Sequence, residues 1–238
     1  MRIIDLHCYP NTQKWIDCQG PYVEALEKYW GRAWQAKTEE EVVAEFTEFG
    51  IDAMLVALDL TTTIETPPCD NNYVAGMRDR HETIIQAWAA IEPALGQAAI
   101  DEAKHAINDL NMIGFHFHPI MQHIRVDDKS FYPLWDEITQ LKVPVMIDVG
   151  MTGMGAGTPG GLGAKTRNAH PESIDALAAD FPDLTIIMSH PGYPWIDETT
   201  AVALHKGNVF WEMSGWSPKY FPDSLKKDIR SRLKDKVM

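Results

Sequence analysis

Short apolar runs rich in β-branched residues alternate along this chain with longer stretches in which apolar side chains recur at helical spacing. The short runs predict strands at Ile3–His7, Ala53–Asp59, Ile84–Ala90, Gly114–His118, Val143–Gly150, Leu184–His190 and Val209–Ser214. The longer stretches predict helices at Glu39–Phe49, Asn72–Arg80, Gly96–Leu110, Phe131–Leu141, Pro171–Phe181, Ile196–Lys206 and Ser224–Leu233. Strands that alternate with helices are typical of a parallel sheet, so the pattern predicts seven βα units.

The expected α/β fold is a (β/α)8 TIM barrel whose eighth strand is cut off at the C-terminus. Such a barrel takes about 250 residues, and this chain of 238 residues ends where Val237-Met238 has the character of an eighth strand's first residues. Apolar residues make up 45% of the chain, enough for one sizeable core, and no change in composition divides it. We therefore expect one domain, residues 1–238, incomplete at its C-terminal end. Either it is a piece of a longer barrel, or a partner or a rearranged segment covers the open edges.

The net charge and the cysteine content limit the binding partners and the cellular compartment that can be expected. A net charge of −13 excludes a nucleic-acid backbone or an anionic membrane surface as the expected partner. The three cysteines are odd in number and lack CxxC spacing, which indicates a reducing compartment, and no stretch is long enough to span a membrane. We expect a cytoplasmic protein with a small-molecule substrate. The sequence does not decide whether it forms a homo-oligomer.

The segment Gly150–Gly163 contains a literal GxGxxG pattern at Gly155, Gly157 and Gly160. The dinucleotide-binding fingerprint requires a helix directly behind its glycines, and here Pro159 and a non-helical stretch intervene. We therefore expect no nucleotide cofactor, and a flexible lid over the barrel mouth in its place.

Several chemically capable side chains end different predicted strands, namely His7, His116, Asp148 and His190. The carboxyl ends of parallel strands in a barrel meet at one face, so we expect these four to converge there. Imidazole nitrogens and a carboxylate suit Zn²⁺ or a similar divalent ion. Taken singly, each has a plainer explanation, as a hydrogen-bonded structural histidine or a loop-capping aspartate.

The chain resembles the amidohydrolase superfamily, in the branch that contains aminocarboxymuconate semialdehyde decarboxylase and aromatic-acid decarboxylases. The resemblance is carried by the glycine-rich loop and by four motifs, Ile4-Asp5-Leu6-His7, Gly114-Phe115-His116-Phe117-His118-Pro119, Ile187-Met188-Ser189-His190-Pro191 and the segment from Ser214-Gly215-Trp216 to Pro222. It implies a single divalent metal, which relatives bind through an HxH pair on strand one, histidines on strands five and six, and an aspartate on strand eight. This chain departs from that set, with Tyr9 in place of the second histidine, Asp148 where strand five supplies a histidine, and His116 where relatives often have lysine.

The resemblance implies a metal-dependent hydrolase or a non-oxidative decarboxylase that acts on a small carboxylated or cyclic compound. The expected ligands of one divalent ion, taken as zinc, are His7, His116, Asp148 and His190. Proton transfer is assigned to Asp148, His116 and His118, and substrate binding to Tyr9, Trp15, Arg167, Tyr193 and Trp216. The alternative is a non-catalytic barrel that binds a small ligand without a metal.

Overall fold

The computed structural model describes residues 3–238, which form two compact units. The first unit contains the chain up to His116 together with Gly153–Ala164, and the second contains Phe117–Thr152 and Lys165–Met238. The glycine-rich loop thus belongs mainly to the first unit, although the strand before it and the helix after it belong to the second.

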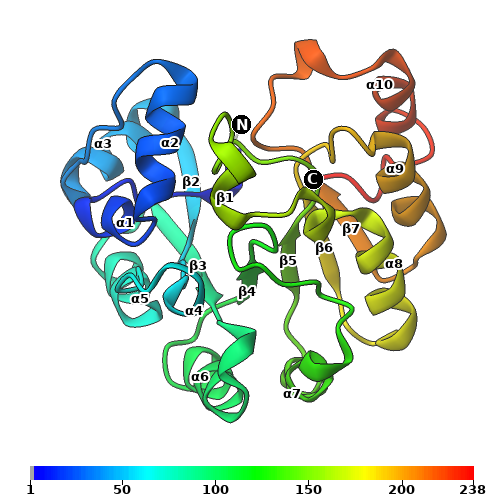
Figure 1. Ribbon diagram of the computed structural model, residues 1–238, viewed down its shortest axis with the longest axis horizontal. Helices are drawn as coiled ribbons and strands as arrows, with labels where there is room; N and C mark the ends of the chain where they lie inside the picture. Colours follow the sequence, from blue (N-terminus) through cyan, green and yellow to red (C-terminus); the bar gives the residue numbers. More distant parts are fainter. Residues whose placement is uncertain (1–2) are drawn as a thin grey trace. The chain divides into compact units, whose positions relative to one another are not determined.

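The first unit is built on parallel strands that pair in chain order, β1 (Ile3–Cys8), β2 (Ile51–Val56), β3 (Ile84–Ala90) and β4 (Gly114–Phe117). Its helices are α1 (Gln13–Asp17), α2 (Pro21–Trp30), α3 (Glu39–Phe49), α4 (Thr61–Ile64), α5 (Asn71–Arg80) and α6 (Gln97–Asn108), with 3₁₀ turns η1 (Pro93–Leu95) and η3 (Pro159–Gly163). Helix α3 packs on β2, and α5 packs on β2 and β3 (Figure 1). Trp88, Phe115 and Leu55 are fully buried between these layers.

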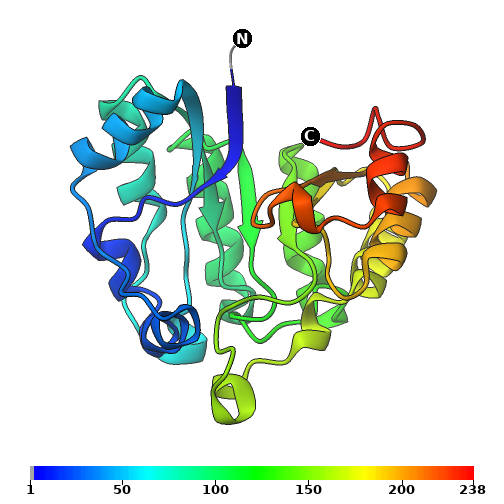
Figure 2. The same cartoon turned by 90° about the horizontal axis from the view of Figure 1, so that it is seen from above.

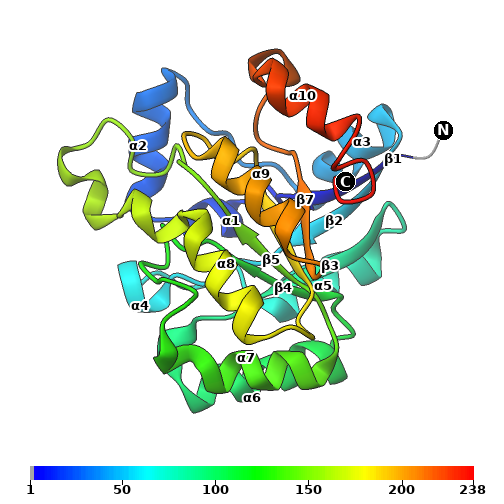
Figure 3. The ribbon, with the colours of Figure 1, turned by 90° about the vertical axis from the view of Figure 1, so that its right-hand side faces the viewer.

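The second unit repeats this plan with the parallel strands β5 (Val145–Asp148), β6 (Ile186–Ser189) and β7 (Val209–Glu212). Its helices are α7 (Tyr132–Leu141), α8 (Pro171–Asp180), α9 (Ile196–His205) and α10 (Asp223–Ile229), with 3₁₀ turns η2 (Lys129–Phe131), η4 (Thr166–Ala169) and η5 (Pro218–Tyr220). Helices α8 and α9 lie side by side along the strands of this unit (Figure 3). Trp135 and Trp211 are completely buried in its core.

All seven predicted strands and all seven predicted helices are present, with shifts of a few residues at their ends. The largest shift is at the end of α10, which stops at Ile229 and not at Leu233. Strand β2 begins at Ile51, two residues earlier than predicted, because Gly50 already ends α3 in a left-handed conformation at φ 66°. A capping box between Thr38 and Glu41 fixes the start of α3. Helices α1, α2 and α4 were not predicted.

The last residues of the chain pair with β7. Trp211 donates its backbone N–H to the Lys236 carbonyl, and Met238 donates its own to the Trp211 carbonyl, each at 2.9 Å. Val237 forms a parallel bridge with Trp211, as the first residues of an eighth strand would. The prediction that strand character begins at Val237 is confirmed.

All three cysteines are free and buried. No helix formed by residues 3–238 is long and apolar enough to cross a membrane.

Glu92 is an unusual buried acid at the end of β3. It is 1% exposed, and one of its carboxylate oxygens accepts a 3.3 Å hydrogen bond from the backbone N–H of Ala94. Burial, and less strongly the charge of Asp59, raises the pKa of Glu92 from 4.5 to about 7. Folding therefore favours the protonated form.

The raised pKa predicts that Glu92→Gln becomes relatively more stabilising as pH rises. The stabilising effect of the protonated carboxyl is complete below pH 4.5 and is lost as pH passes through about 7. Because one pKa unit corresponds to about 1.4 kcal/mol, the difference in unfolding free energy between variant and wild type should grow by roughly 3 kcal/mol between pH 5 and pH 8. Urea unfolding across this range measures it, with the exposed Glu82→Gln as control. A difference that does not change with pH would contradict the assignment.

Candidate active site

In the first unit, His7 and His116 lie against each other at the ends of β1 and β4. Both are buried, at 7% and 3% exposure, and their ring centroids are 4.7 Å apart in an edge-on arrangement. The pairing of β1 with β2 shifts register between Asp5 and Cys8, which inserts one extra residue at the end of β1. The Trp88 indole N–H donates to the Leu6 carbonyl at 2.8 Å and so fixes this irregular segment.

Tyr9 continues the cluster outward from the strand. Its ring meets the His7 ring edge-on at 5.4 Å and stacks on Trp15 at 4.9 Å. Trp15 is only 3% exposed, so it forms the support on which Tyr9 rests.

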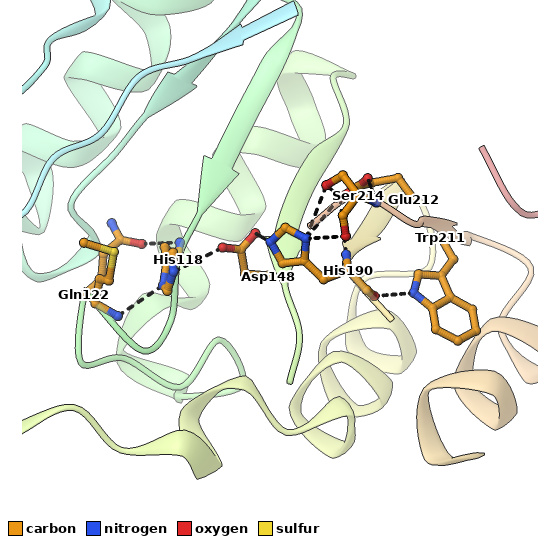
Figure 4. A network of polar contacts seen from close by, with 8 residues as sticks. His118, Gln122, Asp148, His190, Trp211, Glu212 and Ser214 are labelled. Carbon is orange, nitrogen blue, oxygen red and sulfur yellow. Dashed lines mark hydrogen bonds and ion pairs between the residues drawn. The ribbon is translucent and has the colours of Figure 1, made fainter. Parts of the chain in front are cut away.

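In the second unit, Asp148 at the end of β5 lies between two imidazoles (Figure 4). The Nε2 atom of His118 is 3.3 Å from Asp148 Oδ2, and the Nε2 atom of His190 is 3.6 Å from Asp148 Oδ1. The Asp148 residue is 5% exposed. A carboxylate so deeply buried requires positive or hydrogen-bonding neighbours, and the two rings supply them.

The hydrogen bonds of His118 determine which of its nitrogens carries the proton. Its Nδ1 accepts a 3.2 Å hydrogen bond from the backbone N–H of Met121. A nitrogen that accepts has no hydrogen, so the neutral ring carries its hydrogen on Nε2, which lies 3.3 Å from Asp148 Oδ2. His118 in this form has no lone pair on Nε2 to give to a metal.

His190 has the opposite arrangement. Its Nδ1 lies 3.0 Å from the backbone carbonyl of Ser214, which can only accept, so Nδ1 carries a hydrogen. Its Nε2 lies 3.6 Å from Asp148 Oδ1 and is the atom that would bind a metal once it has lost its proton. This is how a metal-binding histidine is commonly oriented by a second hydrogen bond.

The backbone of His190 is fixed from both sides. Its φ of 71° lies in the left-handed region, which is unfavourable for a residue with a side chain. Its N–H donates to Glu212 Oε1 at 3.3 Å, and its carbonyl accepts from the Trp211 indole at 2.6 Å (Figure 4). Glu212 also accepts from the Ser214 N–H at 2.7 Å and from the Ser214 hydroxyl at 2.9 Å, so one buried carboxylate orders the segment that encloses the ring.

The charges around His190 favour a cation at this position. Burial lowers the pKa of His190, but the charge and hydrogen bond of Asp148, followed by the charge of Glu212 and the Ser214 carbonyl, outweigh it and raise the pKa to about 9. The same field that favours a proton on the ring favours a divalent ion. A buried carboxylate with an oriented imidazole is a suitable donor set for such an ion.

The other predicted substrate residues are spread over the second unit. Tyr193 and Trp216 contact each other, with ring centroids 5.3 Å apart. Arg167 is exposed in η4. In the first unit a Cβ on Gly153 of the glycine-rich loop would come within 2.9 Å of the Leu26 side chain on α2. This loop is the yellow-green segment at the lower edge of Figure 2. The convergence of the His7 and His116 pair with Asp148 and His190 stays a prediction, because the two groups belong to different units.

A family model described as amidohydrolase matches residues 4–238. The chain belongs to the amidohydrolase family. It is accordingly an enzyme of the amidohydrolase superfamily, a hydrolase or a carboxy-lyase. No curated protein matches it in sequence.

Solved structures with the same fold cover the whole of this amidohydrolase. They include an uncharacterized TIM-barrel protein from Bordetella bronchiseptica, with 21% identity, 84% of that chain covered and a TM-score of 0.74. A 5-carboxyvanillate decarboxylase from Novosphingobium aromaticivorans with bound manganese has 16% identity, 85% coverage and a TM-score of 0.70. A dihydroxybenzoic acid decarboxylase from Polaromonas, also with bound manganese, has 17% identity, 85% coverage and a TM-score of 0.64. At such identities the likeness shows the fold, a (β/α)8 barrel type as predicted.

Sequence reasoning missed Glu212, the residue that orders the surroundings of His190. The available signal was a carboxylate close to the end of a predicted strand, the same feature that singled out Asp148. Gly215 is the second omission, because nothing in the sequence shows that a Cβ there would come within 2.7 Å of His190 Nδ1.

We predict that Gly215→Ala damages the site while Gly207→Ala does not. At φ 78°, an alanine at 215 is strained and its methyl group meets the His190 ring, whereas nothing lies within 4 Å of a Cβ on Gly207. The variant at 215 should lose about 1–3 kcal/mol of unfolding free energy and bind divalent metal more weakly. Chemical denaturation and metal titration check this. Equal effects at the two positions would show that His190 is not restrained by this segment.

Proposed function

We propose that this chain is a metal-dependent carboxy-lyase that removes the carboxyl group of a small aromatic acid without an oxidant. The observation that carries the proposal is the buried Asp148 carboxyl between two imidazoles, with His118 Nε2 at 3.3 Å and His190 Nε2 at 3.6 Å from its two oxygens. Two solved structures of the same fold are decarboxylases of hydroxylated aromatic acids, which supports the substrate class.

His190, Asp148, His7 and His116 are the residues proposed to bind one divalent ion. Their nitrogen and carboxylate donors fit zinc, and manganese, bound in the two decarboxylase structures, is the alternative. When bound, the ion would supply a positive charge for the substrate carboxylate and a neighbouring hydroxyl. His116 is a second candidate for proton transfer, as the sequence analysis proposes.

Side chains of the protein would transfer the proton that replaces the carboxyl group. In a non-oxidative decarboxylation the bond from the ring carbon to the carboxyl carbon breaks and CO₂ leaves. The ring carbon then takes up a proton in place of the carboxyl group. We assign that transfer to Asp148, whose carboxylate would take up a proton from solvent, pass it to the ring carbon and so end the cycle ionised as it began. His118 acts as a positioning residue, because its Nε2 faces Asp148 Oδ2 at 3.3 Å and would restrain the carboxyl group.

The experiment compares histidine variants of the full chain for metal content and for CO₂ release from a panel of hydroxybenzoates. His190→Gln should lower both, because it removes a ligand. His118→Gln should retain the metal but lower the rate about 10- to 100-fold, with a shifted pH profile. The exposed His205→Gln is the control and should behave as wild type.

Two outcomes would overturn the proposal. The first is turnover of cyclic amides or lactones with no CO₂ release from any acid, which would make the chain a hydrolase, the other activity that the family membership allows. The second is full CO₂ release from His118→Gln and Asp148→Asn, which would remove the proposed proton path.

A further inference from the structure

The first unit contains a cavity of about 470 Å³ that the catalytic assignment does not use. It lies in the connection between β1 and α3, and its lining residues are Tyr9, Asn11, Leu26, Glu27, Trp30, Arg32, Ala33, Trp34, Gln35 and Lys37. Its volume is that of a pocket for a small molecule.

The cavity has flat apolar walls. Trp30 and Trp34 contribute two indoles, and the buried Leu26 contributes an aliphatic side chain. Trp30 remains 56% exposed, which is unusual for so large an apolar group and leaves its surface available to a ligand. Aromatic walls of this kind bind an aromatic ring.

The charged side chains of the cavity differ in whether they already have a binding partner within the protein. Lys37 Nζ lies 2.5 Å from both carboxylate oxygens of Glu45, and Glu27 accepts a 2.6 Å hydrogen bond from the backbone N–H of Trp34. The guanidinium of Arg32 makes no hydrogen bond or ion pair with any of residues 3–238. Arg32 is therefore the cationic group in the cavity that is available to a ligand, and a guanidinium matches the geometry of a carboxylate.

Tyr9 joins this cavity to the predicted chemistry within the same unit. It lines the cavity, and its ring also contacts His7 at 5.4 Å. A ring bound against Tyr9 thus has one end near His7 and the other among the tryptophans.

We propose that this cavity binds the part of the substrate remote from the reacting carboxyl, and that this part is an aromatic ring with a second carboxylate bound by Arg32. The inference rests on the proposed function, since it selects dicarboxylated aromatic acids among the substrates of a carboxy-lyase. A cationic ligand is disfavoured by Arg32, although the indoles would otherwise attract one.

The test measures binding of benzene-1,3-dicarboxylate and of benzoate to the full chain, by calorimetry and by tryptophan fluorescence, with and without added zinc. Wild-type protein should bind the dicarboxylate at least about tenfold more tightly than benzoate, the effect expected of one hydrogen-bonded charge pair. Arg32→Gln should abolish that preference and leave benzoate binding within about twofold. The matched control is Arg230→Gln, an exposed arginine in the second unit, which should keep the preference.

Equal affinity for the two probes in wild type, or an unchanged preference in Arg32→Gln, would overturn the inference. An equal loss of preference in Arg230→Gln would do the same, since it would reduce the effect to overall charge. The proposed function is tested by a different result, since it fails if no aromatic acid releases CO₂. In that case the binding measurements without zinc still decide whether Arg32 binds a carboxylate.

Discussion

A buried carboxylate cannot remain charged inside a protein without compensation, and Asp148 is the point at which this constraint governs the second unit. Its two oxygens face two imidazoles, at 3.3 Å from His118 and 3.6 Å from His190. Each ring is in turn oriented by a backbone group, the Met121 N–H for one and the Ser214 carbonyl for the other. The two rings are therefore held by the carboxylate on one side and by the backbone on the other, which fixes their orientation.

The backbone conformation of His190 is strained by this arrangement. A histidine at φ 71° is retained because Glu212, Trp211 and Ser214 bind its N–H, its carbonyl and its ring nitrogen. Strain of this kind persists where surrounding contacts over-determine the conformation, and it is concentrated at functional sites. Strand β7 and the segment after it thus serve the site, although they supply none of the residues that the sequence analysis proposed as metal ligands.

The parallel βα plan and the histidines and aspartate that end its strands could be predicted, because both follow from local patterns of apolar and polar residues. Three features could not. The extra residue at the end of β1 is fixed by a hydrogen bond to Leu6 from Trp88, which lies 82 positions away in sequence. The tautomers of His118 and His190 depend on tertiary hydrogen bonds. The cavity between Trp30 and Trp34 depends on how α2 and the following turn fold back on Tyr9, in a segment where α1 and α2 were not predicted.

The central claim is the proposal that His190, His7 and Asp148 bind one divalent ion. A crystal of the full chain grown with zinc tests it most directly, by the anomalous diffraction of the ion. The predicted result is one strong peak with His190 Nε2 and a nitrogen of His7 each at roughly 2.0–2.1 Å and Asp148 as a further ligand. A peak that contacts none of these residues, or none at all from protein that is saturated with zinc in solution, would contradict it.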